Sequence, residues 1–92
     1  MKKLHTIELG NSEYTCAQEW LEDQNINLDR STDIRLSYED CLTTIYSYSE
    51  NEFIKVDTAC DIQQQDIYSL TRAETLDYLN RFNQTLLLHL NH

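Results

Sequence analysis

The chain has 92 residues, 40% of them hydrophobic, which suits one domain with a modest core and leaves no room for a separate catalytic domain. It contains no proline and a single glycine, so we expect order from end to end and no flexible linker. The formal net charge is -9, and the segment from Glu8 to Asp66 carries fourteen acidic residues against three basic ones. Such a field repels nucleic acid and anionic membranes and attracts basic partners.

The segment Met1–Leu9 begins with basic residues, but His5 and Glu8 interrupt any apolar core that a secretory signal would need. No apolar run approaches the roughly 20 residues of a spanning helix, so we expect a cytoplasmic protein that does not cross a membrane. The three cysteines, Cys16, Cys41 and Cys60, lack paired C-x-x-C spacing. We interpret them as reduced, buried, structural thiols.

The first half of the chain predicts a strand followed by a helix. Residues 4–9 alternate and stop at the turn pair Gly10-Asn11, which indicates a short strand. Ser12 or Asn11 can cap a helix over residues 13–24, in which Tyr14, Ala17, Trp20 and Leu21 share one face. The polar segment 25–33 is typical of a loop, and residues 34–36 fit a short strand.

The segment 37–48 is compatible with two structures. Tyr38, Cys41, Leu42 and Ile45 make a helical face, whereas Leu42, Thr44, Tyr46 and Tyr48 make an alternating one. Ser37 followed by two acidic residues favours the start of a helix, because carboxylates stabilise the positive end of the helix dipole. We therefore predict a helix that begins at Ser37.

The second half predicts a strand and a long helix. Residues 52–58 are β-branched and alternate, so we expect a strand that extends at most to Ile62, followed by a polar connector at 63–65. Thr71 and Glu74 have the spacing of a capping box, and an apolar stripe continues the helix to about Leu90. The stripe consists of Leu76, Leu79, Phe82, Leu86, Leu87 and Leu90. The whole predicts an α+β domain over residues 1–92, with two or three helices on a short antiparallel sheet of two to four strands and a long C-terminal amphipathic helix.

No pattern in the chain indicates catalysis, a metal or a cofactor. His89 and His92 lie three residues apart, but no cysteine or carboxylate partner is near them in sequence. Nucleophile motifs and phosphate-binding glycine loops are absent. The paired carboxylates have polar neighbours in the sequence, so we expect them to be exposed to solvent. A carboxyl group that serves in acid–base catalysis needs burial or a specific partner to shift its pKa. We expect a non-enzymatic protein that works by binding another macromolecule.

The densest acidic clusters and the tyrosines between them are the candidate binding residues. Tyr14, Trp20 and Tyr38 are expected in the core, whereas aromatic side chains elsewhere can grip a partner. The candidates are Glu19, Glu22 and Asp23 in the first helix, and Glu39, Asp40, Tyr46, Tyr48, Glu50 and Glu52 around the central segment.

In size and charge, though not in any motif, the chain resembles phage anti-CRISPR and anti-restriction proteins and the immunity proteins of toxic nucleases. This resemblance implies an acidic inhibitor whose carboxylates replace phosphates on the nucleic-acid-binding surface of a basic protein. As an alternative, the chain is similar to small acidic chaperones of type III secretion, which hold effectors and have an amphipathic C-terminal helix. That family usually begins with a helix, whereas this chain is expected to begin with a strand. Tyr78 and Leu88 add apolar surface on the other faces of the last helix, so we expect homodimerisation through residues 71–90.

Overall fold

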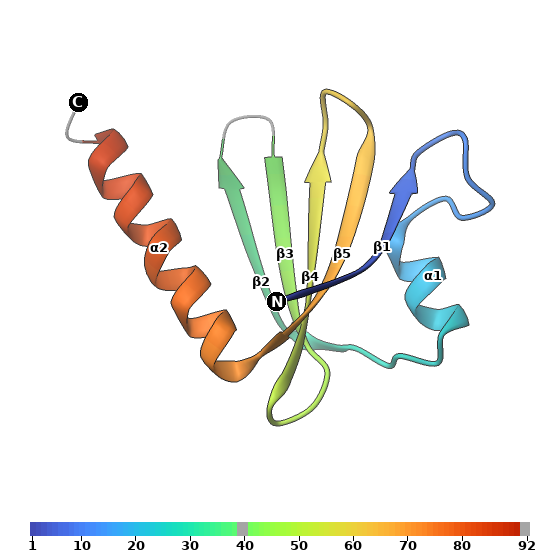
Figure 1. Cartoon of the computed structure of the whole chain (residues 1–92), viewed down its shortest axis with the longest axis horizontal. Helices are drawn as coiled ribbons and strands as arrows, with labels where there is room; N and C mark the ends of the chain where they lie inside the picture. The colour runs from blue at the N-terminus through green and yellow to red at the C-terminus, as the bar shows by residue number, and fades with distance from the viewer. Residues whose placement is uncertain (39–40, 91–92) are drawn as a thin grey trace.

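The computed structural model describes residues 1–38 and 41–90, and they form an antiparallel five-stranded sheet with two helices (Figure 1). The elements in chain order are β1 (Lys2–Glu8), α1 (Ala17–Asp23), β2 (Asp29–Tyr38), β3 (Cys41–Ser47), β4 (Glu52–Ala59), β5 (Gln64–Thr71) and α2 (Arg72–Leu90). The α+β class predicted from the sequence is confirmed. The sheet has one strand more than the largest number predicted.

The strand order is β1-β5-β4-β3-β2, so β1 and β2 lie at opposite edges of the sheet. After β1 the chain passes through α1 to the far edge and then returns strand by strand until β5 pairs with β1. Because successive hairpins reverse direction, the β3–β4 turn and the β4–β5 turn lie at opposite ends of the sheet. This separation determines which acidic residues can act together.

The main core lies between α1 and one face of the sheet. Ala17 and Leu21 of α1 pack against Ile7, Ile54, Val56 and Ile67 from β1, β4 and β5. These side chains are almost fully removed from solvent, and burial of each leucine, isoleucine or valine among them contributes roughly 1.5–3 kcal/mol. His5 stacks in parallel on Trp20, with 4.8 Å between ring centroids, at the border of this core.

The helix α2 starts on the opposite face of the sheet. The Oγ1 of Thr71 accepts the backbone N–H of Glu74 at 3.2 Å, and the Glu74 carboxylate accepts the N–H of Thr71 at 2.9 Å, which confirms the predicted capping box. Thr75 is buried and Tyr78 reaches β3, but Leu76 is 57% exposed. Leu76 therefore does not belong to a core stripe, and the predicted amphipathic packing holds only in part.

The start of the first helix was predicted too early. The helix begins at Ala17 because the Ser12 hydroxyl accepts the N–H of Tyr14 in a local turn instead of capping a helix at Glu13. Cys16 is the N-cap residue and makes no side-chain capping hydrogen bond. The loop predicted over residues 25–33 is shorter, since β2 begins at Asp29 and includes the strand predicted at 34–36.

The prediction of a helix from Ser37 is wrong. Residues up to Tyr38 belong to β2 and Cys41–Ser47 form β3, which pairs with strands on both sides. In β3, Thr43 and Ile45 point to the face of the sheet where α2 starts. Thr44 and Tyr46 point to the face that α1 covers, so both faces of this strand are in contact with other parts of the protein. The strand predicted at 52–58 is confirmed as β4.

Two further predictions differ from the structure. The polar residues Gln64 and Gln65 are not part of a connector, because they begin β5 between β1 and β4. Cys41 and Cys60 are exposed, and only Cys16 is partly buried. Cys41 is the first residue of β3 and Cys60 directly follows the last residue of β4, so both thiols lie at strand ends rather than in the core. Neither helix, over the residues described, is long and apolar enough to cross a bilayer.

Candidate interaction surface

The outer side of α1 forms an acidic hollow, which we define by its lining residues Glu13, Tyr14, Glu19, Glu22 and Asp23. Leu21 and Ala17 anchor the opposite side of the same helix in the core. The helical repeat therefore directs the three carboxylates of α1 away from the sheet. Among the residues that the structure describes, four acids and one tyrosine line the hollow, and no basic side chain does.

Hydrogen bonds orient the three α1 carboxylates. Tyr14 Oη donates to Asp23 Oδ2 at 2.6 Å, and Gln18 Nε2 donates to Glu22 Oε1 at 2.9 Å. The Thr15 hydroxyl and backbone N–H both donate to the Glu19 carboxylate. These bonds reduce the number of rotamers that each carboxylate must give up when a partner binds.

The same bonds shift two pKa values in the hollow. The hydrogen bond to Asp23 and the negative charge of that carboxylate raise the pKa of Tyr14 to about 12, because they disfavour the phenolate. The hydrogen bonds from the Thr15 hydroxyl and backbone lower the pKa of Glu19 by stabilising its ionised form. Glu19 therefore remains charged at neutral pH, and Tyr14 remains a hydrogen-bond donor.

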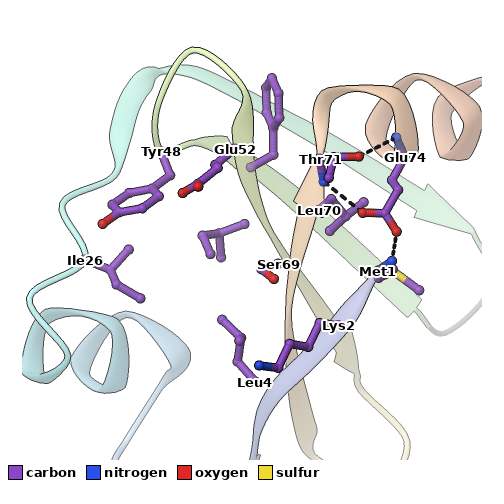
Figure 2. Close-up of a pocket in the computed structure, with 12 residues that line it drawn as sticks. Met1, Lys2, Leu4, Ile26, Tyr48, Glu52, Ser69, Leu70, Thr71 and Glu74 are labelled. Carbon is purple, nitrogen blue, oxygen red and sulfur yellow. Dashed lines mark hydrogen bonds and ion pairs between the residues drawn. The ribbon is translucent and has the colours of Figure 1, made fainter.

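A groove of about 460 Å³ lies at the end of the sheet that carries the β3–β4 turn (Figure 2). Its lining includes the apolar residues Leu4, Ile26, Ile54 and Leu70, with Tyr48 and Glu52 from the turn and from the start of β4. At one rim the amino group of Met1 pairs with Glu74, which belongs to the capping box of α2. The groove thus combines an apolar floor with charged groups at its rim.

A small hollow joins the groove to the acidic hollow. It is lined by Gln18, Leu21, Glu22, Ile26, Asn27 and Leu28. It shares Glu22 with the acidic hollow and Ile26 with the groove. The outer side of α1 and the β3–β4 turn therefore belong to one continuous surface.

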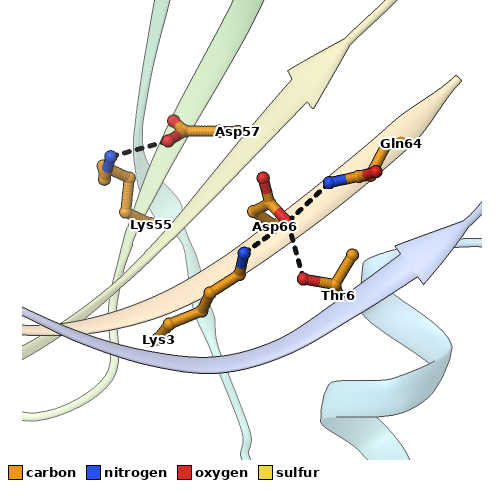
Figure 3. Close-up of polar contacts among 6 residues, drawn as sticks. All are labelled: Lys3, Thr6, Lys55, Asp57, Gln64 and Asp66. Atoms are coloured by element: carbon orange, nitrogen blue, oxygen red, sulfur yellow. Dashed lines mark hydrogen bonds and ion pairs between the residues drawn. The ribbon is translucent and has the colours of Figure 1, made fainter. Parts of the chain in front are cut away.

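The opposite face of the sheet carries a row of polar residues (Figure 3). Thr6, Asp66, Asp57 and Thr43 are consecutive cross-strand neighbours on β1, β5, β4 and β3. Thr6 Oγ1 donates to Asp66 at 2.7 Å, and Thr43 Oγ1 donates to Asp57 at 2.6 Å. Lys55 Nζ donates to Asp57 at 2.7 Å and lies 4.5 Å and 4.6 Å from the ring centroids of Tyr68 and Tyr78.

This row is organised as a structural network. Partial burial acts to raise the pKa of Asp66, but hydrogen bonds from Thr6, Gln64 and Lys3 outweigh it, and the pKa is lowered. Both carboxylates accept hydrogen bonds from donors within the protein. Through Tyr78, which also donates to Thr43 at 3.4 Å, the network connects the sheet to α2.

The predicted site residues fall into separate places. Glu19, Glu22 and Asp23 lie together in the acidic hollow, whereas Tyr48 and Glu52 line the groove. Glu50 is exposed in the β3–β4 turn and lines neither. Tyr46 is half-buried against the core. Glu39 and Asp40 lie outside the described residues.

The strand β3 occupies most of the central segment. Cys41, the first described residue after Glu39 and Asp40, begins β3, and Ser47 ends it before the turn that holds Glu50. The seven residues of β3 span about 20 Å at roughly 3.3 Å per residue. Of the described candidate residues in this segment, Tyr48 and Glu52 at its turn end line the groove.

The sequence did not identify three residues of this surface. Tyr14 was assigned to the core, and it does pack against the core while its hydroxyl reaches Asp23. Glu13 was included in the helix but not among the binding residues. Ile26 lines both the groove and the small hollow. It is an apolar residue in a polar segment of the sequence, and this contrast is the signal that could have identified it.

None of the described residues come together in a group of three or more His, Cys, Asp or Glu side chains that could hold a metal ion. Comparison of the chain with protein-family models, with curated proteins and with solved structures gives no match. Function is therefore inferred from the surface itself.

Proposed function

We propose that the protein is a non-enzymatic inhibitor that acts in the cytoplasm by occupying the nucleic-acid-binding surface of a basic protein. The observation that supports this proposal is the acidic hollow, which is lined by Glu13, Glu19, Glu22 and Asp23 and, over the described part of the chain, by no basic side chain. Potentials of opposite sign guide two proteins to encounter and select the correct partner. A net charge of -9 extends this attraction to the whole molecule.

Carboxylates on a helix can imitate the charge spacing of a nucleic acid. The seven residues of α1 rise about 10 Å and carry Glu19, Glu22 and Asp23. Three charges over about 10 Å amount to one per roughly 3.4 Å, which is the charge spacing along one strand of duplex DNA. Hydrogen bonds hold these carboxylates in fixed positions, as the sugar-phosphate backbone holds phosphates. Because the carboxylates are already oriented, binding costs them little conformational entropy.

The test begins with capture of partners from cell lysate at low and at high salt, followed by measurement of affinity for the captured protein. We expect a basic nucleic-acid-binding protein whose binding weakens steeply with salt, because at about 0.15 M ionic strength charges are screened beyond about 8 Å. Addition of DNA or RNA should displace it. A partner that tolerates high salt and is not displaced by nucleic acid would contradict the proposal.

Charge reversal tests the surface itself. Glu19→Lys, Glu22→Lys and Asp23→Lys combined should lower the affinity about tenfold or more, while the circular dichroism spectrum stays unchanged. The matched control reverses three exposed acids elsewhere, Glu8, Asp61 and Asp77, and so changes the net charge by the same amount. Equal losses in the two triple variants would indicate a general effect of charge rather than recognition by α1.

A second candidate function is an acidic chaperone that holds a partly unfolded effector. The observation that favours it is Leu76, which is 57% exposed on α2 and offers apolar surface to a client. In that case Leu76→Ser lowers client affinity and the triple reversal on α1 leaves it unchanged. The triple reversal on α1 and Leu76→Ser therefore distinguish the inhibitor from the chaperone.

A further inference from the structure

We infer that the groove beside Tyr48 receives one large apolar side chain, aromatic, leucine or methionine, from a lysine- or arginine-rich segment of the protein partner. This inference rests on the proposed function, because the same segment would place its basic residues on the acidic hollow. It identifies the chemistry of the recognised segment, which charge alone does not specify.

The groove and the acidic hollow are close enough to be contacted by one segment. The hollow between them shares Ile26 with the groove and Glu22 with the acidic hollow. Figure 2 shows Ile26, on the segment that follows α1, beside Tyr48 of the β3–β4 turn. A chain that lies along α1 therefore reaches the groove without crossing the sheet.

The floor of the groove is preformed and apolar. Ile54 belongs to a strand that is paired on both sides and is almost fully buried, so it cannot move aside, while Leu4 and Ile26 complete the floor. Tyr48 is 41% exposed and forms one wall. A volume of about 460 Å³ falls in the range of roughly 300–1,000 Å³ that is usual for pockets that take organic groups. An apolar side chain placed here would remove Tyr48 and this floor from water.

The charges around the groove select basic flanking residues. Glu52 lies beside Tyr48, and its carboxylate has no ion-pair partner among the described residues. The three hollows together are lined by six carboxylates, which are Glu13, Glu19, Glu22, Asp23, Glu52 and Glu74. Of the basic side chains that the structure describes, Lys2 alone lines them, on the wall of the groove away from Glu52. An acidic segment or a nucleic acid would be repelled from this surface, whereas a basic segment would be attracted.

The experiment uses labelled peptides as probes and the full chain as receptor, with fluorescence anisotropy at low salt as the measurement. One short peptide consists of lysines and arginines around a central tryptophan. The second replaces the tryptophan with serine, and the third replaces the basic residues with glutamate. The inference predicts that the first peptide binds about tenfold or more tightly than the second, as expected for a buried aromatic anchor, and that the third does not bind.

Two variants test whether the tryptophan occupies the groove. Ser69→Leu replaces a small side chain of the lining with a larger one that fills part of the groove, without changing any charge. Tyr48→Ser removes the aromatic ring that forms one wall. Each should reduce the advantage of the tryptophan peptide to about twofold or less. The matched control is Ile62→Ser, because Ile62 is 64% exposed in the β4–β5 turn at the opposite end of the sheet. This control should leave both affinities unchanged.

The results separate failure of the inference from failure of the proposed function. If the tryptophan and serine peptides bind with equal affinity, and the triple reversal in α1 abolishes binding of both, the inference about the groove is wrong and the proposed acidic surface is supported. A tryptophan advantage that survives Ser69→Leu and Tyr48→Ser also overturns the groove. Binding of the tryptophan peptide that is lost in the groove variants but unaffected by reversal in α1 supports the groove and contradicts the proposed function. Binding of the acidic peptide contradicts both.

Discussion

Asp57 on β4 and Asp66 on β5 are direct cross-strand partners, so two carboxylates lie side by side on one face of the sheet. Like charges in this position are destabilising unless they are compensated. Lys55 and Thr43 donate to Asp57, and Lys3, Thr6 and Gln64 donate to Asp66. The stability of this face therefore depends on donors that come from four strands.

Lys55 is 3% exposed, and its removal should destabilise the fold. Lys55→Met leaves the Asp57 carboxylate without its ion pair and removes the contacts with the rings of Tyr68 and Tyr78. We expect the free energy of unfolding to fall by about 1–3 kcal/mol in urea denaturation at pH 7. Lys55→Met combined with Asp57→Asn should recover part of this loss. No recovery would show that Lys55 acts through packing alone.

The pKa of Asp66 predicts a loss of stability in acid. Because the folded-state pKa is below the unfolded value of about 3.9, the carboxylate stabilises the fold above that value. The contribution is lost as the pH falls through the folded pKa. We expect the free energy of unfolding of the wild type to fall more steeply below about pH 4 than that of Asp66→Asn. Parallel curves for the two proteins would contradict the assignment.

The hydroxyl of Tyr14 provides a direct measure of the acidic hollow. Its pKa is raised to about 12 by Asp23, so the side chain should ionise well above the usual value of 10.0. In Asp23→Asn the charge is removed, and the pKa should return toward 10.0. NMR titration of the Tyr14 ring measures both values. Glu8→Gln, a charge removal away from α1, should leave the titration unchanged.

The exposure of the thiols predicts their reactivity in the folded protein. Cys41 and Cys60 are exposed and should react with a thiol reagent under native conditions, ahead of the partly buried Cys16. Cys41→Ala and Cys60→Ala should change the free energy of unfolding by no more than about 0.5 kcal/mol. Partner binding should survive in each variant. A single alanine variant that folds normally but does not bind would contradict this prediction.

Self-association through α2 remains a prediction from the sequence. Leu76 is 57% exposed and offers apolar surface that a second copy could cover. Light scattering at tens of micromolar protein should give a dimer mass, and Leu76→Ser should shift it toward the monomer. A monomer mass for the wild type would contradict dimerisation through this helix.

The sequence by itself determined the elements whose signals are local. The capping box at Thr71 and Glu74 specifies a helix start through its own hydrogen bonds, and β-branched alternation specifies β4. The acidic cluster of Glu19, Glu22 and Asp23 could also be recognised, because these residues are close in the chain and one helical repeat places them together.

The tertiary structure decided the rest, because the deciding interactions join residues far apart in the chain. Segment 41–47 is a strand since β2 and β4 pair with it on both sides, and Gln64 and Gln65 extend β5 since β1 and β4 supply partners. The sheet also separates the two ends of β3, so the predicted central acidic patch reaches the groove only through Tyr48 and Glu52. Ile26 joins this groove to α1 because the chain crosses one end of the sheet there, and no local pattern encodes that crossing.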